Sequence, residues 1–87
     1  LDAARRRDAG EDVTLLASST KLFATEASGR VADRAVQVFG GAGYVADYGI
    51  ERFYRDVRIF RLYEGTSQIQ QIIIARELAR AAKAGRL

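Results

Sequence analysis

The sequence has 87 residues, enough for one small domain with little interior to bury. Apolar residues make up 48% and charged residues 29%, and the net charge of +3 permits anionic partners without requiring them. Cysteine and histidine are absent, which excludes disulfides, thiolate metal sites and the usual histidine base. We therefore expect no metal site, and acid–base chemistry falls to carboxylates, Lys, Tyr or Arg.

We expect neither a targeting segment nor a membrane-spanning segment in this sequence. Proline is absent, and no apolar run approaches the ~20 residues of a membrane span. The sequence begins at Leu1 with a cluster of arginines close behind, which is not the layout of a signal peptide. We expect a cytoplasmic piece of a larger protein, in the form of one helical domain over residues 1–87.

A first helix over residues 1–8 is predicted to end at Gly10, and a much longer one to run from Asp12 to Phe39, with Asp12 or Thr14 as its cap. Apolar residues recur along the long helix at helical spacing, namely Leu16, Phe23, Ala27, Val31, Ala35 and Val38. Small residues would let another helix approach closely. At ~1.5 Å per residue this helix is about 40 Å long. A lone domain of this size would cover it poorly, so we expect an all-α, up-and-down helical bundle completed by oligomerisation.

Residues 40–44 are rich in glycine and are predicted to end the long helix in a tight turn. A shorter helix is predicted over Ile50–Phe60, with Phe53, Tyr54 and Phe60 interpreted as core. The last helix is predicted from about Thr66 to Lys83, with Ser67 and Gln70 as a capping box.

Two patterns indicate ligand binding only weakly. The glycines at 40, 41 and 43 would expose backbone N–H groups to a phosphate, but a helix end explains them as well, and Gln37 just before them either meets a ligand or faces solvent. Arginines at every third position from 52 to 61 drift around a helix and form no coherent stripe. We expect a solvated face there and no nucleic-acid partner.

Glu64 is the candidate catalytic residue. Apolar residues precede it, and Gly65 removes a side chain beside it, so that a substrate is able to approach the backbone. Hydroxyl and amide groups of Thr66, Ser67 and Gln68 follow at a helix N-terminus, beside unpaired N–H groups. A carboxylate base next to such hydrogen-bond donors is typical of a catalytic site, although a carboxylate in a loop is ordinarily only solvated.

Three segments, Gln37–Tyr44, Glu51–Asp56 and Tyr63–Gln70, resemble the C-terminal helical domain of the acyl-CoA dehydrogenases in sequence, order and separation. The resemblance covers about residues 12–82. It implies α,β-dehydrogenation of acyl-CoA thioesters to trans-2-enoyl-CoA, as in fatty acid metabolism. FAD would be the cofactor, and an electron-transfer acceptor and further copies of the chain would be partners.

Residue by residue, the resemblance implies that Glu64 removes a proton from the carbon α to the thioester. Its backbone N–H would polarise the thioester carbonyl, and Gly65 would lie against the substrate. The other matching positions contact FAD in the family: Thr66 and Gln68, and, in a loop that reaches the FAD of a neighbouring subunit, Gln37, Gly40 and Gly41.

The family also has an N-terminal helical domain and a middle β domain, and neither is present in this sequence. We therefore expect the isolated chain to be inactive. Two other interpretations stay open at this stage. One is a helical self-association module without catalytic activity, and the other is a small basic nucleic-acid-binding protein.

Overall fold

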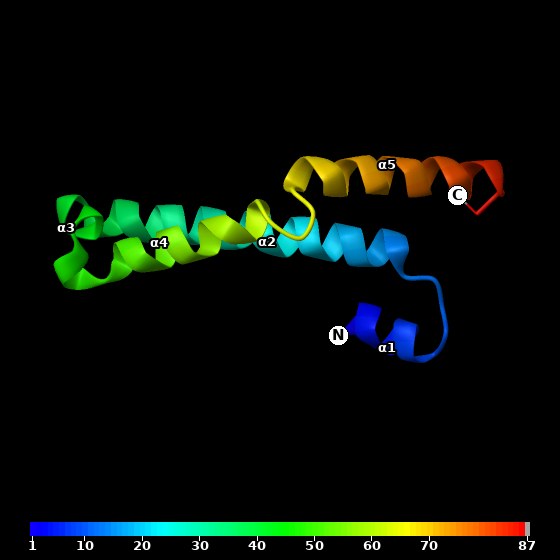
Figure 1. The fold of residues 1–87 in the computed structure, drawn as a ribbon, viewed down its shortest axis with the longest axis horizontal. Coiled ribbons are helices and arrows are strands. Elements are labelled where there is room, and N and C mark those ends of the chain that lie inside the picture. Colours follow the sequence, from blue (N-terminus) through cyan, green and yellow to red (C-terminus); the bar gives the residue numbers. More distant parts are fainter. Residues whose placement is uncertain (87) are drawn as a thin grey trace.

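The computed structural model describes residues 1–86, and all regular structure within them is helical (Figure 1). In chain order the elements are α1 (Asp2–Asp8), α2 (Thr14–Phe39), α3 (Gly41–Tyr44), the 3-10 helix η1 (Ala46–Tyr48), α4 (Ile50–Arg58), the 3-10 helix η2 (Ile59–Arg61) and α5 (Ser67–Lys83). The predicted all-α class is confirmed. Leu87, the last residue of the expected domain, lies outside the described residues.

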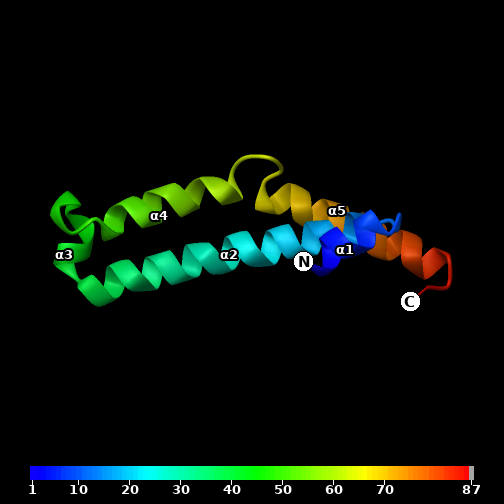
Figure 2. The ribbon, with the colours of Figure 1, turned by 90° about the horizontal axis from the view of Figure 1, so that it is seen from below.

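Helix α2 is the axis of the molecule. Helix α4 packs along its C-terminal half and α5 along its N-terminal half, and both run antiparallel to it, one after the other (Figure 1). The resulting shape is elongated, 54 × 24 × 20 Å. Helix α1 folds back below the start of α2 (Figure 1), so the two overlap when the molecule is seen from below (Figure 2). No helix within residues 1–86 has the length and apolar character needed to cross a membrane.

Both ends of α2 are close to their predicted positions, but the N-cap residue is Val13 and not Asp12 or Thr14. The Asp12 carboxylate accepts hydrogen bonds from the Thr14 N–H, at 3.0 Å, and from the Thr14 hydroxyl, at 2.8 Å. These two bonds stabilise the ionised carboxylate and lower the pKa of Asp12. At the other end Gly40 adopts a positive φ of 63°, and its N–H bonds the Gln37 carbonyl.

The glycine segment after α2 does more than turn the chain. Instead of a tight turn, residues Gly41–Tyr44 form the short helix α3. Gly43 is buried against the last turns of α2, where a Cβ would lie 2.5 Å from the Val36 carbonyl oxygen. This glycine is therefore required by close packing, which a reading of the turn alone did not predict.

Small residues mediate the contact between α2 and α4, as predicted. Ala32 of α2 is buried, and a groove between the two helices is lined by Ala27, Ser28, Val31 and Ala35 of α2 and by Ile50, Phe53 and Val57 of α4. Because these α2 side chains are short, α4 approaches closely but buries little apolar area.

The interpretation of Phe53, Tyr54 and Phe60 as core is wrong for this chain. Their exposed fractions are 65%, 42% and 40%. The apolar residues of α2 behave similarly, since Phe23 is 72% exposed and Val38 is 86% exposed. The physical reason is that α2 is the one long helix within residues 1–86 against which α4 and α5 pack. The other contacts of α4 are with the short elements α3, η1 and η2, so much of the surface of these helices is left uncovered.

The start of α5 also differs from the prediction. The helix begins at Ser67, so Thr66 is the N-cap, and its hydroxyl accepts a hydrogen bond from the Ile69 N–H at 3.2 Å. A capping box between Ser67 and Gln70 would need a start one residue later. Both side chains are instead turned toward the preceding loop and α2, where they help to build the site described next.

Candidate functional site

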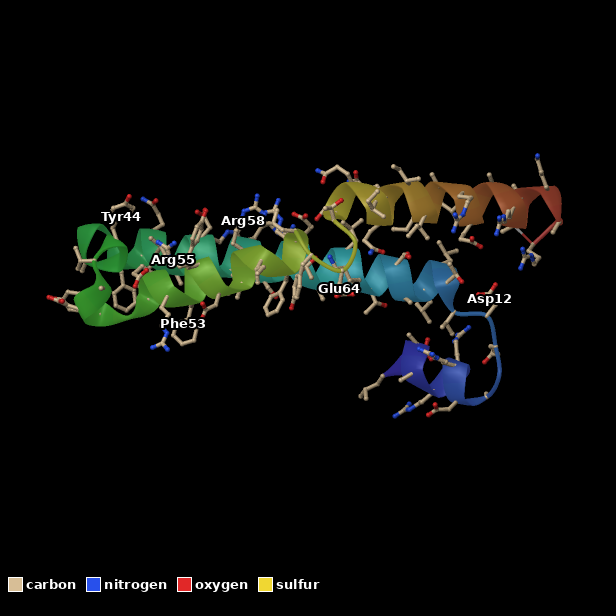
Figure 3. All side chains as sticks on the ribbon, in the orientation of Figure 1. Asp12, Tyr44, Phe53, Arg55, Arg58 and Glu64 are labelled. Atoms are coloured by element: carbon tan, nitrogen blue, oxygen red, sulfur yellow. The ribbon has the colours of Figure 1, made fainter. Side chains whose placement is uncertain are left out.

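Glu64 lies on the short connection between η2 and α5, beside the middle of α2 (Figure 3). Its φ of 54° is left-handed, and among residues 1–86 it is the only non-glycine residue with a positive φ. L-residues rarely adopt this conformation because Cβ approaches the backbone oxygen. The Glu64 side chain is exposed. The backbone conformation of Glu64 is therefore stabilised by contacts of other residues and not by its own side chain.

Lys21 of α2 forms hydrogen bonds with the loop that carries Glu64, on the N-terminal and on the C-terminal side of Glu64. Its Nζ donates one hydrogen bond to the Phe60 carbonyl and one to the Gly65 carbonyl, each at 2.7 Å. A charged donor makes stronger hydrogen bonds than a neutral one. A single ammonium group thus joins the two ends of the loop that carries Glu64.

Glu26, one turn and a half further along α2, holds the flanking elements. Its Oε1 accepts from Arg61 Nε of η2 at 3.0 Å and from the Ser67 hydroxyl of α5. The Ser67 hydrogen bond is the main reason that the pKa of Glu26 is lowered, and Arg61 acts in the same direction, against partial burial. The carboxylate is therefore ionised and fixes where η2 ends and α5 begins.

Glycine is favoured at position 65 by the left-handed backbone, and the Gln70 side chain would have to shift to admit a Cβ there. The φ of Gly65 is 91°, and a Cβ at this position would lie 2.5 Å from Gln70 Nε2. Gln70 is buried and its amide points back to the Gly65 carbonyl, 3.5 Å away. The local backbone thus explains this glycine, in addition to the room for a substrate that the sequence suggested.

The remaining predicted positions fall into two groups. Thr66 and Gln68 adjoin Glu64 at the start of α5, and the capping bond leaves the Thr66 O–H free to donate to another partner. Gln37, Gly40 and Gly41 lie at the far end of α2 and are exposed, with nothing within 4 Å of a Cβ built on either glycine. The structure therefore does not bring all the predicted positions together.

The separation between the two groups follows from helix geometry. Gln37 is about 16 Å beyond Glu26 along α2, at about 1.5 Å per residue. A ligand bound near Glu64 would have to extend by about this distance along α2 to contact Gln37 of the same chain. The arrangement fits better with two separate ligand contacts, one at each place.

Lys21 and Glu26 were missed by the sequence reading. Their partners lie 35 to 44 residues further along the chain, and a helical pattern does not reveal such contacts. In the structure Ser18, Thr25 and Ala32 lie on the side of α2 that packs inward, and Lys21 lies on the same side, roughly opposite the apolar face predicted from the sequence. A charged residue on a packing face is a reason to look for its partners.

Other hollows lie along α2 and α4. One is lined by Arg30, Arg58 and Arg61 together with Asp33, and another by Tyr44, Glu51 and Tyr54 near α3. Glu64 lines neither of them. In this chain the candidate base therefore stands on an open surface.

A sequence model of the family described as "Acyl-CoA dehydrogenase, C-terminal domain" matches residues 1–79. The chain belongs to this family. The acyl-CoA dehydrogenase resemblance stated from three segments is thereby confirmed, and the match extends over most of the chain. It covers α1, α2, α3 and α4 entirely and most of α5, including the loop that carries Glu64.

Individual acyl-CoA dehydrogenase relatives agree with this assignment. The chain is 48% identical over 77 residues to a 3-(aryl)acrylate reductase of Clostridium sporogenes, covering 88% of this chain and 20% of the relative. It is 46% identical over 80 residues to a cyclohexane-1-carbonyl-CoA dehydrogenase of Geobacter metallireducens, covering 92% of this chain and 21% of the relative. It is 45% identical over 74 residues to a subunit of a caffeyl-CoA reductase–Etf complex of Acetobacterium woodii, covering 85% of this chain and 20% of the relative. The chain thus spans about a fifth of the length of these relatives.

Proposed function

We infer that this chain is the C-terminal helical domain of an FAD-dependent acyl-CoA dehydrogenase. The parent enzyme would convert an acyl-CoA thioester to a trans-2-enoyl-CoA. The observation that carries the proposal is Glu64, held in a left-handed conformation on a braced loop, in a chain of this family. A strained residue that its surroundings hold in place is typical of functional sites.

The proposed role of Glu64 is that of the general base. Its exposed carboxylate would take a proton from the carbon α to the thioester carbonyl. Among the hydrogen bonds found within residues 1–86, none uses the Glu64 N–H. That N–H is therefore available to the thioester oxygen, where it would stabilise the negative charge that develops as the proton leaves. Gly65 would let the thioester approach this backbone.

The residues at the start of α5 and those at the C-terminal end of α2 suit contacts with FAD. Thr66 has a hydroxyl hydrogen to donate, and Gln68 is exposed beside it. Gly40 and Gly41 have open space beside their backbone, and Gln37 is exposed on the preceding turn. When bound, FAD accepts the hydride from the β carbon of the substrate. These residues would hold and orient it.

The distance between the two groups supports an assembly of several copies. Thr66 and Gln68 would contact one flavin, and Gln37, Gly40 and Gly41 the flavin of a neighbouring copy. The exposed apolar residues of α2 and α4 are suited to such contacts. The electron acceptor is a further proposed partner, and one relative is a subunit of an Etf complex.

The substrate is proposed only as an acyl-CoA. The relatives are named for different acyl groups and for reduction as well as dehydrogenation. The residues that would line an acyl pocket do not surround Glu64 in this chain, so we assign neither chain length nor branching. The cytoplasmic location expected from the sequence stays a prediction.

A helical self-association module is the second candidate function. The high exposure of Phe23, Val38 and Phe53 favours contacts with other chains. This alternative gives no reason for the conformation of Glu64. The two functions differ in whether the Glu64 carboxylate is needed for turnover.

Substitution of Glu64 by Gln in the full-length enzyme tests the proposal. Gln keeps the size of the side chain but does not accept the proton, so kcat should fall about 10²–10⁴-fold, the usual contribution of a general base. Bound flavin, measured by its absorbance, should stay at the wild-type level. The matched control is Glu11→Gln, in the exposed link between α1 and α2, which should leave turnover unchanged. Near-normal turnover of Glu64→Gln would contradict the proposed role.

A further inference from the structure

The Glu64 conformation is not held by contacts of Glu64 itself. Its side chain is exposed and has no ion pair or hydrogen bond within residues 1–86. Its φ of 54° is intrinsically unfavourable for a residue with a Cβ. An isolated loop of this sequence would therefore relax to a right-handed or extended conformation. Something outside the loop must keep Glu64 where it is.

Lys21 is placed to do this. Its ammonium group, on the rigid helix α2, bonds the Phe60 carbonyl before Glu64 and the Gly65 carbonyl directly after it, both at 2.7 Å. The residues between these carbonyls, 61–64, are thus closed into a ring by one side chain. Lys21 is half-buried, which strengthens its hydrogen bonds relative to those of a solvated lysine.

Glu26 gives the same loop a second attachment. Its carboxylate bonds Arg61, which directly follows Phe60, and the hydroxyl of Ser67, which is the first residue of α5. The ends of the loop are therefore tied to α2 by two side chains of opposite charge. Removing either one leaves the other in place, but of these two only Lys21 bonds the backbone next to Glu64. The Gln70 amide also reaches the Gly65 carbonyl, at the longer distance of 3.5 Å.

We propose that Lys21 is a positioning residue of the dehydrogenation reaction, holding the Glu64 carboxylate and N–H in register with the thioester through the Phe60 and Gly65 carbonyls. This inference rests on the proposed function. Lys21 touches neither the substrate nor the reacting atoms; it acts through the loop. Misplacement of a catalytic group by about 1 Å is enough to lower a rate about 100-fold. Loss of Lys21 should therefore lower kcat.

The test is Lys21→Met in the full-length flavoenzyme, with two readouts. Met keeps the length and apolar stem of Lys but donates no hydrogen bond. We expect kcat per bound flavin to fall about 10- to 100-fold, with a smaller change in KM. We also expect faster hydrogen exchange of the Leu62 and Tyr63 amides, which lie inside the loop that Lys21 closes and whose N–H groups bond the Ile59 carbonyl. Lys21→Arg, which keeps the charge and donors, should recover part of both properties.

The control is Lys83→Met, at the exposed C-terminal end of α5, which removes the only other lysine of the chain. It should change neither readout. A merely structural role of Lys21 would lower the amount of folded, flavin-bound enzyme but leave kcat per bound flavin at the wild-type value, and this result would overturn the inference. Unchanged exchange of the Leu62 and Tyr63 amides would overturn it as well.

The two proposals fail in different ways. If Glu64→Gln abolishes turnover and Lys21→Met leaves kcat per flavin unchanged, the base stands and the positioning role of Lys21 is wrong. If Glu64→Gln keeps near-normal turnover, the proposed base is wrong, and with it the catalytic part of the inference. Faster amide exchange in Lys21→Met would then show only that Lys21 orders the loop.

Discussion

At the scale of single residues, the chain concentrates its unusual backbone geometry in two adjacent positions. Glu64 and Gly65 both have positive φ, at 54° and 91°. Lys21 and Gln70 approach the Gly65 carbonyl from two different helices. An unfavourable conformation persists only where such contacts determine it. The loop is therefore expected to be sensitive to very small substitutions.

Gly65→Ala is the sharpest of these substitutions. Ala has a Cβ, which is unfavourable at a φ of 91° and would meet the buried Gln70 amide at 2.5 Å. We expect a loss of about 1 kcal/mol or more in the free energy of unfolding, measured by urea titration. The same change at Gly29, in the middle of α2, should instead stabilise by about 0.5–1 kcal/mol, because its backbone is helical and the nearest side-chain atom is 3.4 Å away. Equal effects of the two substitutions would contradict this account of the loop.

The sequence predicted part of the residue-scale picture. Glu64 and its glycine were recognisable as a loop between two helices, because a run of apolar residues stops there and hydroxyls follow. Lys21 and Glu26 were not, because their partners are distant in sequence. The apolar spacing within α2 also indicates a face, including Phe23 and Val38, that is exposed in the structure. The positive φ of Glu64 was also beyond prediction, because the surrounding contacts impose it.

At the scale of elements, the contacts between α2 and the start of α5 are partly electrostatic. Glu26 of α2 joins both η2 and α5, and its pKa is lowered by the Ser67 hydroxyl and by Arg61. A carboxyl group with a lowered pKa in the folded state stabilises the fold above its ordinary pKa. This stabilisation is lost as the pH falls through the folded-state value. The junction between α2 and α5 should therefore weaken in acid.

The pH dependence is best measured as a difference between two proteins. We expect the wild type to be more stable than Glu26→Gln at pH 7, and the difference in free energy of unfolding to shrink as the pH falls below the ordinary carboxyl value of 4.5. Asp12 also has a lowered pKa, but it is present in both proteins and cancels. A difference that is constant from pH 7 to pH 3 would show that the Glu26 charge does not stabilise the junction.

Element boundaries were predicted well where helix signals are local. The long helix, its glycine end and the last helix all lie within a few residues of their expected positions. The cap of α5 was misassigned by one residue, because Thr66 and Ser67 are both good capping residues and only the contact of Ser67 with Glu26 decides between them. The short helix α3 was missed, because its glycines are equally typical of a turn.

At the scale of the whole molecule, the chain leaves much apolar surface uncovered. Phe23, Val38 and Phe53 are 72%, 86% and 65% exposed, and the buried apolar core of residues 1–86 consists of Ala32 and Ala81. Sequence periodicity identified the apolar faces but not what covers them, because that depends on surfaces outside the chain. Such surfaces are costly to leave in water.

We expect the isolated chain to self-associate for this reason. Light scattering at micromolar concentration should give a mass above that of one chain, and Val38→Lys should lower it because the exposed apolar face then carries a charge. The isolated chain should bind no stoichiometric flavin and turn over no acyl-CoA. A monomer at these concentrations would contradict the expected association, and flavin-dependent turnover by the chain alone would contradict the need for further domains.

The central claim is that Glu64 takes the α proton, and proton transfer itself tests it most directly. An acyl-CoA deuterated at the α carbon is incubated with the full-length flavoenzyme in ordinary water, and the loss of deuterium is followed by mass spectrometry. We expect rapid loss with the wild type, about 10- to 100-fold slower loss with Lys21→Met, and about 10²–10⁴-fold slower loss with flavin-bound Glu64→Gln. Loss of deuterium at the wild-type rate in Glu64→Gln would contradict the central claim.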